Sequence, residues 1–153
     1  MPRRELRDPK QVDDWLSELG AQLTAPGSLT LIGSGGLLWH AAQRGIATPL
    51  PENSMDVDPV TDSDEVAERC YDAMIGSEFE RRHGWHVNLM PDSVLCELPP
   101  GWETRAAQKT CSKLTVTVPS PADLLAPKLR RNEPRDRAHE AWALAVGLLD
   151  SKP

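Results

Sequence analysis

The residues best suited to chemistry are two aspartates separated by a single residue, Asp56 and Asp58. Successive side chains of a β-strand point to opposite faces, so in a strand the two carboxylates share one face while Val57 turns toward the core. Carboxylate oxygens are ligands that Mg²⁺ and Mn²⁺ prefer. The spacing therefore predicts that Asp56 and Asp58 bind a divalent cation.

A glycine-rich segment, Gly33-Ser34-Gly35-Gly36, precedes the aspartate pair. It follows the apolar residues 29–32 and leads into the apolar residues 37–39, a pattern that indicates a strand, a turn and then a helix. A turn of this kind presents backbone N–H groups to phosphate. A phosphate cradle together with a metal pair suggests chemistry on a nucleoside triphosphate (NTP).

The remaining pattern predicts a single domain, residues 1–153, of the α+β class. An amphipathic helix is expected at about 10–24, a sheet core at about 29–118 and helices at about 120–150. The element order α, β-α-β-α-β-β-β, α-α predicts a mixed β-sheet with helices packed against it. Strands are expected from Leu29, at 56–58, at 85–90 and at 114–118; the last helix should begin near Pro134 and bury Ala138, Trp142, Ala145 and Leu149.

Composition narrows the function classes. A net charge of -6 argues against nonspecific coating of nucleic acid, although the basic residues between Lys128 and Arg137 offer a local cationic site for a polyanion. No apolar run is long enough to span a membrane and the first residues do not form a secretion signal, so a cytoplasmic protein is expected. Cys70, Cys96 and Cys111 are odd in number and widely spaced, which favours reduced thiols that serve packing.

Three motifs in this order resemble the DNA-polymerase-β-type nucleotidyltransferase superfamily. They are the turn at 33–36, the pair Asp56 and Asp58, and the late segment in which Asp123-Leu-Leu-Ala-Pro-Lys128-Leu precedes Arg135-Asp136. The closest likeness is to small bacterial members, the AbiEii-like and minimal nucleotidyltransferases associated with toxin–antitoxin systems. The resemblance extends from about Leu29 to Leu149.

The resemblance implies a polymerase-β-like fold and the transfer of a nucleoside monophosphate from an NTP to an acceptor hydroxyl. It implies that Gly33, Ser34 and Gly35 hold the triphosphate, that Asp56 and Asp58 are catalytic and bind Mg²⁺, and that Lys128 contacts phosphate. The acceptor would be an RNA, a protein or a small molecule, and a cognate toxin or antitoxin is a candidate partner.

One position departs from the family pattern. The family usually has a third carboxylate on a neighbouring strand, and the equivalent position here is Asn88. An amide oxygen can be a metal ligand, but it carries no charge and cannot take up the acceptor's proton. His86, on the same strand face, is an alternative base because its ordinary pKa is near neutrality.

Plainer interpretations remain beside these. The glycine turn could be only a tight connection, Asp56 and Asp58 a solvated sheet edge, and the basic run a solvated helix face with a surface ion pair between Arg135 and Asp136. The turn could also belong to a dinucleotide-binding fold, although Leu38 stands where its third glycine would be. A catalytically silent nucleotidyltransferase fold that binds nucleotide or a partner protein is the main rival, favoured by Asn88. Exposed tryptophans would favour a partner surface; the candidates are Trp39, Trp85, Trp102 and Trp142.

Overall fold

The structure is a computed structural model that describes residues 6–51 and 55–150; residues 1–5, 52–54 and 151–153 of the expected domain lie outside the described part. The helices are α1 (Pro9–Gln22), α2 (Gly33–Gln43), α3 (Asp64–Tyr71), α4 (Glu78–His83), α5 (Trp102–Arg105), α6 (Pro121–Arg131) and α7 (Pro134–Ala145), together with a 3₁₀ helix, η1 (Asp92–Glu97). The strands are β1 (Gly27–Ile32), β2 (Asp56–Val60), β3 (His86–Val87), β4 (Ala107–Cys111) and β5 (Leu114–Val118).

The strands form one mixed, five-stranded sheet in the order β3-β2-β1-β5-β4. Strand β1 is antiparallel to β2 and parallel to β5, β2 is parallel to β3, and β4 is antiparallel to β5. The α+β class and the mixed sheet predicted from the sequence are therefore confirmed. The antiparallel pairing of β1 with β2 excludes the alternative of a doubly wound dinucleotide-binding fold, in which these two strands would be parallel.

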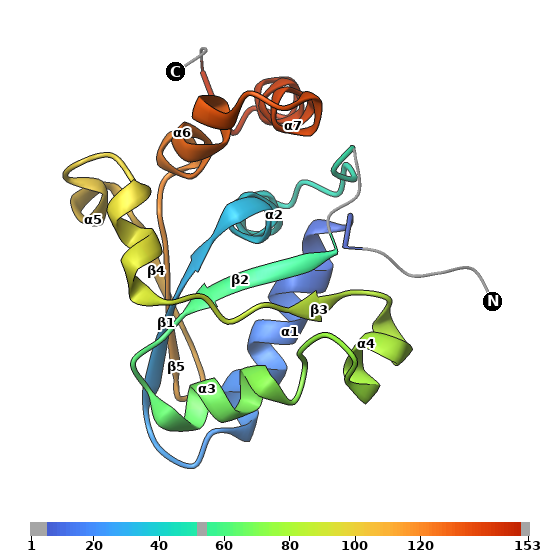
Figure 1. Ribbon diagram of the computed structural model, residues 1–153, viewed down its shortest axis with the longest axis vertical. Helices are drawn as coiled ribbons and strands as arrows, with labels where there is room; N and C mark the ends of the chain where they lie inside the picture. Colours follow the sequence, from blue (N-terminus) through green and yellow to red (C-terminus); the bar gives the residue numbers. More distant parts are fainter. Residues whose placement is uncertain (1–5, 52–54, 151–153) are drawn as a thin grey trace.

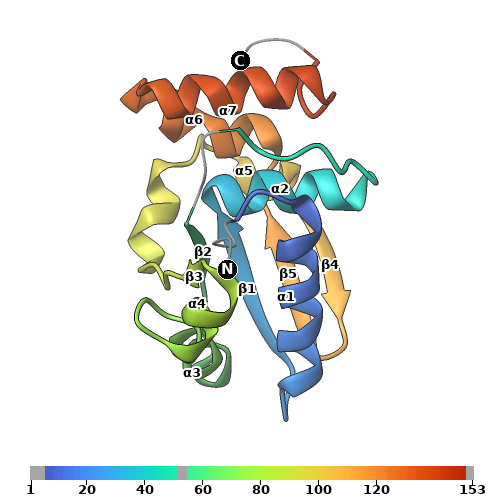
Figure 2. The same cartoon turned by 90° about the vertical axis from the view of Figure 1, so that its right-hand side faces the viewer.

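The helices divide between a face and an end of this sheet. Helix α1 packs against β4 and β5 while α3 packs against β1, and Figure 2 shows α1 running along the strands. Helix α2 crosses the end of β1, with α6 and α7 beyond it at one end of the molecule (Figure 1). This arrangement places α6 and α7, the last helices, above the strand that bears the two aspartates.

Local sequence explains where the long helices begin. Asp8 caps α1 by accepting a hydrogen bond from the Lys10 backbone N–H, and Pro9 occupies the first helical turn, which needs no donor there. Ser120 caps α6 in the same way, ahead of Pro121. The apolar face of α1 is buried as expected, through Val12, Trp15, Leu16 and Leu19.

Several expectations need correction. The third strand is only His86–Val87, although the Asn88 and Met90 backbone N–H groups still donate to Val57 and Pro59. In α7, Ala145 is exposed and Ala143 is buried instead, because the helix ends at Ala145 and the chain turns at Gly147 so that Leu148 and Leu149 return to the core.

Two further corrections concern side chains. Cys96 is exposed on η1 and does not pack, whereas Cys70 is buried; all three cysteines are free. Each tryptophan considered as a partner surface is at most 9% exposed, so tryptophan gives no support to such a surface.

Among the described residues, no helix combines the length and apolar character needed to cross a membrane.

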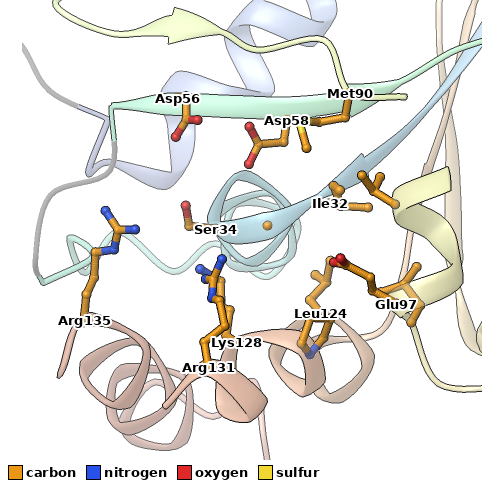
Figure 3. A pocket seen from close by; sticks show the side chains of 14 residues that line it. Ile32, Ser34, Asp56, Asp58, Met90, Glu97, Leu124, Lys128, Arg131 and Arg135 are labelled. Carbon is orange, nitrogen blue, oxygen red and sulfur yellow. The ribbon is translucent and has the colours of Figure 1, made fainter. Parts of the chain in front are cut away.

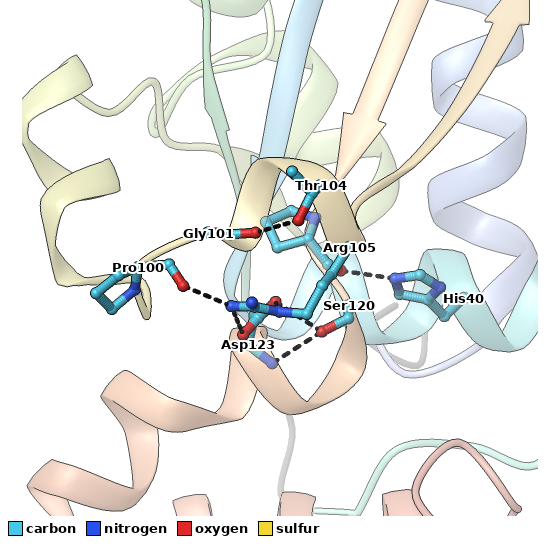
Figure 4. A network of polar contacts seen from close by, with 8 residues as sticks. His40, Pro100, Gly101, Thr104, Arg105, Ser120 and Asp123 are labelled. Carbon is cyan, nitrogen blue, oxygen red and sulfur yellow. Dashed lines mark hydrogen bonds and ion pairs between the residues drawn. The ribbon is translucent and has the colours of Figure 1, made fainter.

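A polar network fastens the segment after β3 to the start of α6 (Figure 4). The Arg105 guanidinium donates to both carboxylate oxygens of Asp123, from Nε at 2.9 Å and Nη2 at 3.0 Å, and also to the Pro100 carbonyl oxygen. Nearby, Nε2 of the buried His40 lies 2.7 Å from the Pro119 carbonyl oxygen. Burial lowers the pKa of His40, so the neutral ring donates this bond.

Candidate active site

A cleft of about 360 Å³ lies between the end of the sheet, η1 and the last two helices. Its size is within the range of small-molecule sites. Ile32, Gly33 and Ser34 line it together with Asp56, Asp58, Met90, Val94, Glu97, Leu98, Leu124, Pro127, Lys128, Arg131 and Arg135. Figure 3 shows the carboxylates of β2 on one side and the cations of α6 and α7 on the other. The structure thus brings the predicted Asp56, Asp58, Gly33, Ser34 and Lys128 into one cavity.

The sheet register sets the position of the aspartates. Asp58 pairs with Ile32 across the β1–β2 ladder, so its carboxylate lies beside the first residue of α2. Asp56 and Asp58 are half-buried and share a face, while Val57 between them is fully buried, as the alternation predicts. Burial and the neighbouring Asp56 carboxylate raise the pKa of Asp58 to about 7. Two acids held this close favour a cation between them.

Glycine is required at the start of α2 for two reasons. Gly33 has a φ of 71°, and a Cβ there would lie 2.8 Å from Oδ2 of Asp58. A Cβ on Gly35 would lie 3.2 Å from Cγ1 of Val57, so Gly35 sits beneath the cleft and lets α2 pack closely on β2. Gly35 therefore does not line the cleft with Gly33 and Ser34, and only its backbone N–H belongs to the helix start.

The start of α2 carries partial positive charge. Its N-cap residue, Ile32, makes no side-chain capping bond, and the first N–H groups of a helix have no acceptor within the helix. The aligned peptide dipoles add to this charge over the 11 residues of α2. Backbone and dipole therefore favour an anion at Gly33 and Ser34.

Three cations face the carboxylates from the C-terminal helices: Lys128 and Arg131 of α6 and Arg135 of α7. Lys128 is only 7% exposed, and burial lowers its pKa although the charge of Asp136 opposes that effect. The basic run is thus not a solvated helix face at Lys128. Arg131 and Arg135 line the same side of the cleft as Lys128. The spacing of three residues between Lys128 and Arg131 places both on one face of a helix and could have indicated the role of Arg131.

Asp136 holds two of these cations from behind. It is fully buried, and its Oδ1 lies 3.0 Å from Nη2 of Arg131 and 3.9 Å from Nζ of Lys128. The expected surface ion pair with Arg135 is therefore wrong, because the first turn of α7 points Asp136 inward toward α6. Nδ1 of the buried His139 lies 3.4 Å from Lys128 Nζ. Burial alone would raise the pKa of Asp136, but the hydrogen bond and charge of Arg131 hold it below its usual value.

Asn88 and His86 lie beside the cleft and not among the residues that line it. Nδ2 of the exposed Asn88 donates to Oδ1 of Asp58 at 3.4 Å and also contacts Sδ of Met90. His86 is directed away, since its Nδ1 lies 2.7 Å from Oε2 of Glu80 on α4. The geometry thus keeps Asn88 in contact with an expected metal ligand and pairs His86 with another acid.

The donor set fits Mg²⁺ or Mn²⁺ of the kind that is shared with a bound phosphate. Within residues 6–51 and 55–150, no three His, Cys, Asp or Glu side chains gather to enclose a metal by themselves. Mg²⁺ commonly takes one or two carboxylates and completes its shell with water and substrate phosphates. Asp56 and Asp58 supply two such carboxylates. The amide oxygen of Asn88 would be a third ligand after the amide is turned over, since Nδ2 contacts Asp58 in this structure.

Sequence comparison agrees with the fold. Residues 10–148 match the family described as a nucleotidyltransferase of unknown function (DUF6036), and the chain belongs to this family. The protein is therefore a nucleotidyltransferase at the level of the superfamily. No curated protein and no solved structure matches the chain.

Proposed function

We propose that the protein is a metal-dependent nucleotidyltransferase that moves a nucleoside monophosphate from an NTP to an acceptor hydroxyl. The observation that supports this most strongly is that Asp56 and Asp58 face Lys128 and Arg131 across a single cleft at the N-terminus of α2. Catalysis of phosphoryl-type transfer depends mainly on positioning and on charge stabilisation, and this cleft offers both signs of charge within reach of one ligand.

The triphosphate would lie between α2 and the C-terminal helices. The N–H groups of Gly33 and Ser34 would donate to its oxygens, while Lys128, Arg131 and Arg135 would neutralise its charge. Burial of Lys128 strengthens its interaction with an anion, because less water screens the pair.

Asp56, Asp58 and the amide oxygen of Asn88 would hold the metal. When bound, Mg²⁺ or Mn²⁺ would supply Lewis-acid stabilisation of the negative charge that develops on the leaving group. The acceptor oxygen would form a bond to the α-phosphorus as the bond from that phosphorus to the bridging oxygen breaks. Pyrophosphate would leave with that oxygen, and the hydroxyl proton would pass to water, since the Asn88 amide cannot accept it.

The motifs resemble those of small bacterial nucleotidyltransferases related to AbiEii, which are associated with toxin–antitoxin systems. The proposal therefore includes a toxin–antitoxin role with a cognate toxin or antitoxin as partner. The acceptor is an RNA, a protein or a small molecule. The acidic net charge disfavours a long nucleic acid and the cluster of Lys128, Arg131 and Arg135 favours a polyanion.

The test is transfer of label from each α-³²P-labelled NTP into RNA, lysate protein and small molecules, with Mg²⁺ or Mn²⁺. The double variant Asp56→Asn/Asp58→Asn should lose labelling by a factor of roughly 10³ or more, because both carboxylates act on the same step. A matched control is Asp72→Asn/Asp92→Asn, which removes two exposed carboxylates outside the cleft. Equal labelling by wild type and the cleft variant would overturn the mechanism.

A second candidate is a silent member of the fold that binds an NTP without transferring it. Asn88 favours this candidate, because an uncharged amide replaces the expected third acid beside Asp58. Such a protein would bind NTPs through Lys128 and Arg131 and yet give no label with any acceptor.

A further inference from the structure

The two ends of the cleft differ in chemistry. Ser34, Asp56 and the three cations occupy one end, and apolar side chains occupy the other, where η1 meets α6 (Figure 3). The apolar residues are Ile32, Met90, Val94, Leu98, Leu124 and Pro127. Glu97 is the one acidic side chain at this end among the described residues that line the cleft, and Figure 3 shows its carboxylate turned inward.

This asymmetry orients a nucleotide, if the proposed function holds. A triphosphate bound by Lys128, Arg131 and Arg135 directs its nucleoside toward the opposite end, past Asp58. The planar base would then lie between the apolar side chains of Ile32 and Leu124, where burial of its faces is favourable. The edge of the base would meet Glu97.

The backbone holds Glu97 in this position. Its carbonyl oxygen accepts a hydrogen bond from Nη2 of Arg130 on α6, and the next residue, Leu98, is buried and donates its N–H to the Leu95 carbonyl. The carboxylate is therefore carried on a segment tied to the same helix that bears Lys128. An exposed side chain on a fixed backbone can adjust to a base edge without moving the cleft wall.

We propose that Glu97 selects guanine and that GTP is the preferred NTP. An ionised carboxylate only accepts hydrogen bonds, through two oxygens side by side. Guanine presents two adjacent donors, N1–H and the 2-amino group, which match both oxygens at once. Adenine and cytosine each present one amino donor beside a ring-nitrogen acceptor, and uracil presents one donor between two carbonyl oxygens. Each of these bases sets an acceptor against the carboxylate, which costs affinity.

Binding of GTP, ATP, CTP and UTP to the whole protein with Mg²⁺, measured by titration calorimetry, tests the proposal without any acceptor. Wild type should bind GTP at least about tenfold more tightly than the other three, the effect of one charge-assisted hydrogen bond. Glu97→Gln should weaken GTP binding about tenfold and should not weaken ATP binding, because the amide can donate to N1 of adenine while it accepts from the 6-amino group. Glu103→Gln, an exposed residue of α5 outside the cleft, should change neither.

A gain of binding makes the test sharper. Xanthosine triphosphate has a carbonyl oxygen where guanine has its amino group, so the Glu97 carboxylate should reject it. The glutamine amide of Glu97→Gln can accept from N1–H and donate to this oxygen, so this variant should bind xanthosine triphosphate more tightly than wild type does.

Equal binding of the four NTPs by wild type, or GTP preference that survives Glu97→Gln, would overturn the guanine proposal and leave nucleotidyl transfer untouched. GTP-selective binding without transfer to any acceptor would support the guanine proposal while removing the catalytic one. Failure to bind any NTP would overturn both.

Discussion

Asn88 donates a hydrogen bond from Nδ2 to Oδ1 of Asp58, at 3.4 Å. An uncharged amide thus contacts the carboxylate at the position where the resemblance to polymerase-β-type nucleotidyltransferases implies a third acid. We expect Asn88→Asp to raise the rate of nucleotidyl transfer by about 10²-fold, because a carboxylate adds both metal affinity and a proton acceptor. Initial rates at saturating Mg²⁺ measure this. No gain in a variant that still binds NTP would favour the silent candidate.

Gly33→Ala should damage the cleft more than the fold. Gly33 and Gly45 both have a φ of 71°, so alanine at either position should cost about 1–2 kcal/mol of stability from backbone strain. A Cβ on Gly33 would meet Asp58 Oδ2 at 2.8 Å, whereas nothing lies within 4 Å of a Cβ on Gly45. Urea denaturation should show similar losses for the pair. Transfer and NTP affinity should fall only in Gly33→Ala, and an equal fall in Gly45→Ala would contradict the contact with Asp58.

Asp136→Asn should destabilise the protein by about 3 kcal/mol at neutral pH, because it leaves the buried Lys128 without its nearest counter-charge. The folded-state pKa of Asp136 is lowered, so its stabilising contribution is complete above the ordinary aspartate pKa. This contribution is lost as the pH falls through the lowered value. Unfolding curves for wild type and variant should therefore converge in acid. A gap that is constant with pH would show that shape, and not charge, makes Asp136 stabilising.

Lys128→Met should separate nucleotide binding from folding. Methionine matches the length and apolar stem of the buried lysine, so stability should change by less than about 1.5 kcal/mol. Loss of the cation that faces the carboxylates should weaken NTP binding by about 10-fold to 100-fold. Lys113→Met, at an exposed turn whose lysine contacts the Thr24 carbonyl, is the control. Unaltered affinity in Lys128→Met would remove Lys128 from the proposed triphosphate site.

The features predicted well are those with strong local signals. The alternation around Val57 predicted the strand and the shared face of its aspartates, and Ser120-Pro121 predicted the start of α6. Strand β4 was not located, because its residues Gln108, Lys109 and Thr110 are exposed at the sheet edge and lack apolar alternation. β-Strand propensity mainly reflects the burial of side chains on one face of a sheet, and an edge strand buries few side chains.

The site was predicted on its carboxylate side and only partly on its cationic side. The charged residues next to Asp136 in the sequence predict a surface position for it. The packing of α7 against α6 buries it instead. Nothing in the sequence around Glu97 indicates that it lines the cleft. Its position depends on contacts between η1 and α6, and the pattern of apolar residues does not predict such contacts. Tertiary placement, and not residue type, made these positions part of the cleft.

The opposing walls of the cleft come from distant parts of the chain, the carboxylates from β2 and the cations from α6 and α7. During synthesis β2 leaves the ribosome long before α7 does. A partial chain therefore carries acids that repel one another and an anion, with no positive wall to counter them. Competence toward a triphosphate would arise only after α6 and α7 have docked, so a nascent chain should be unable to consume nucleotide before both helices have emerged from the ribosome.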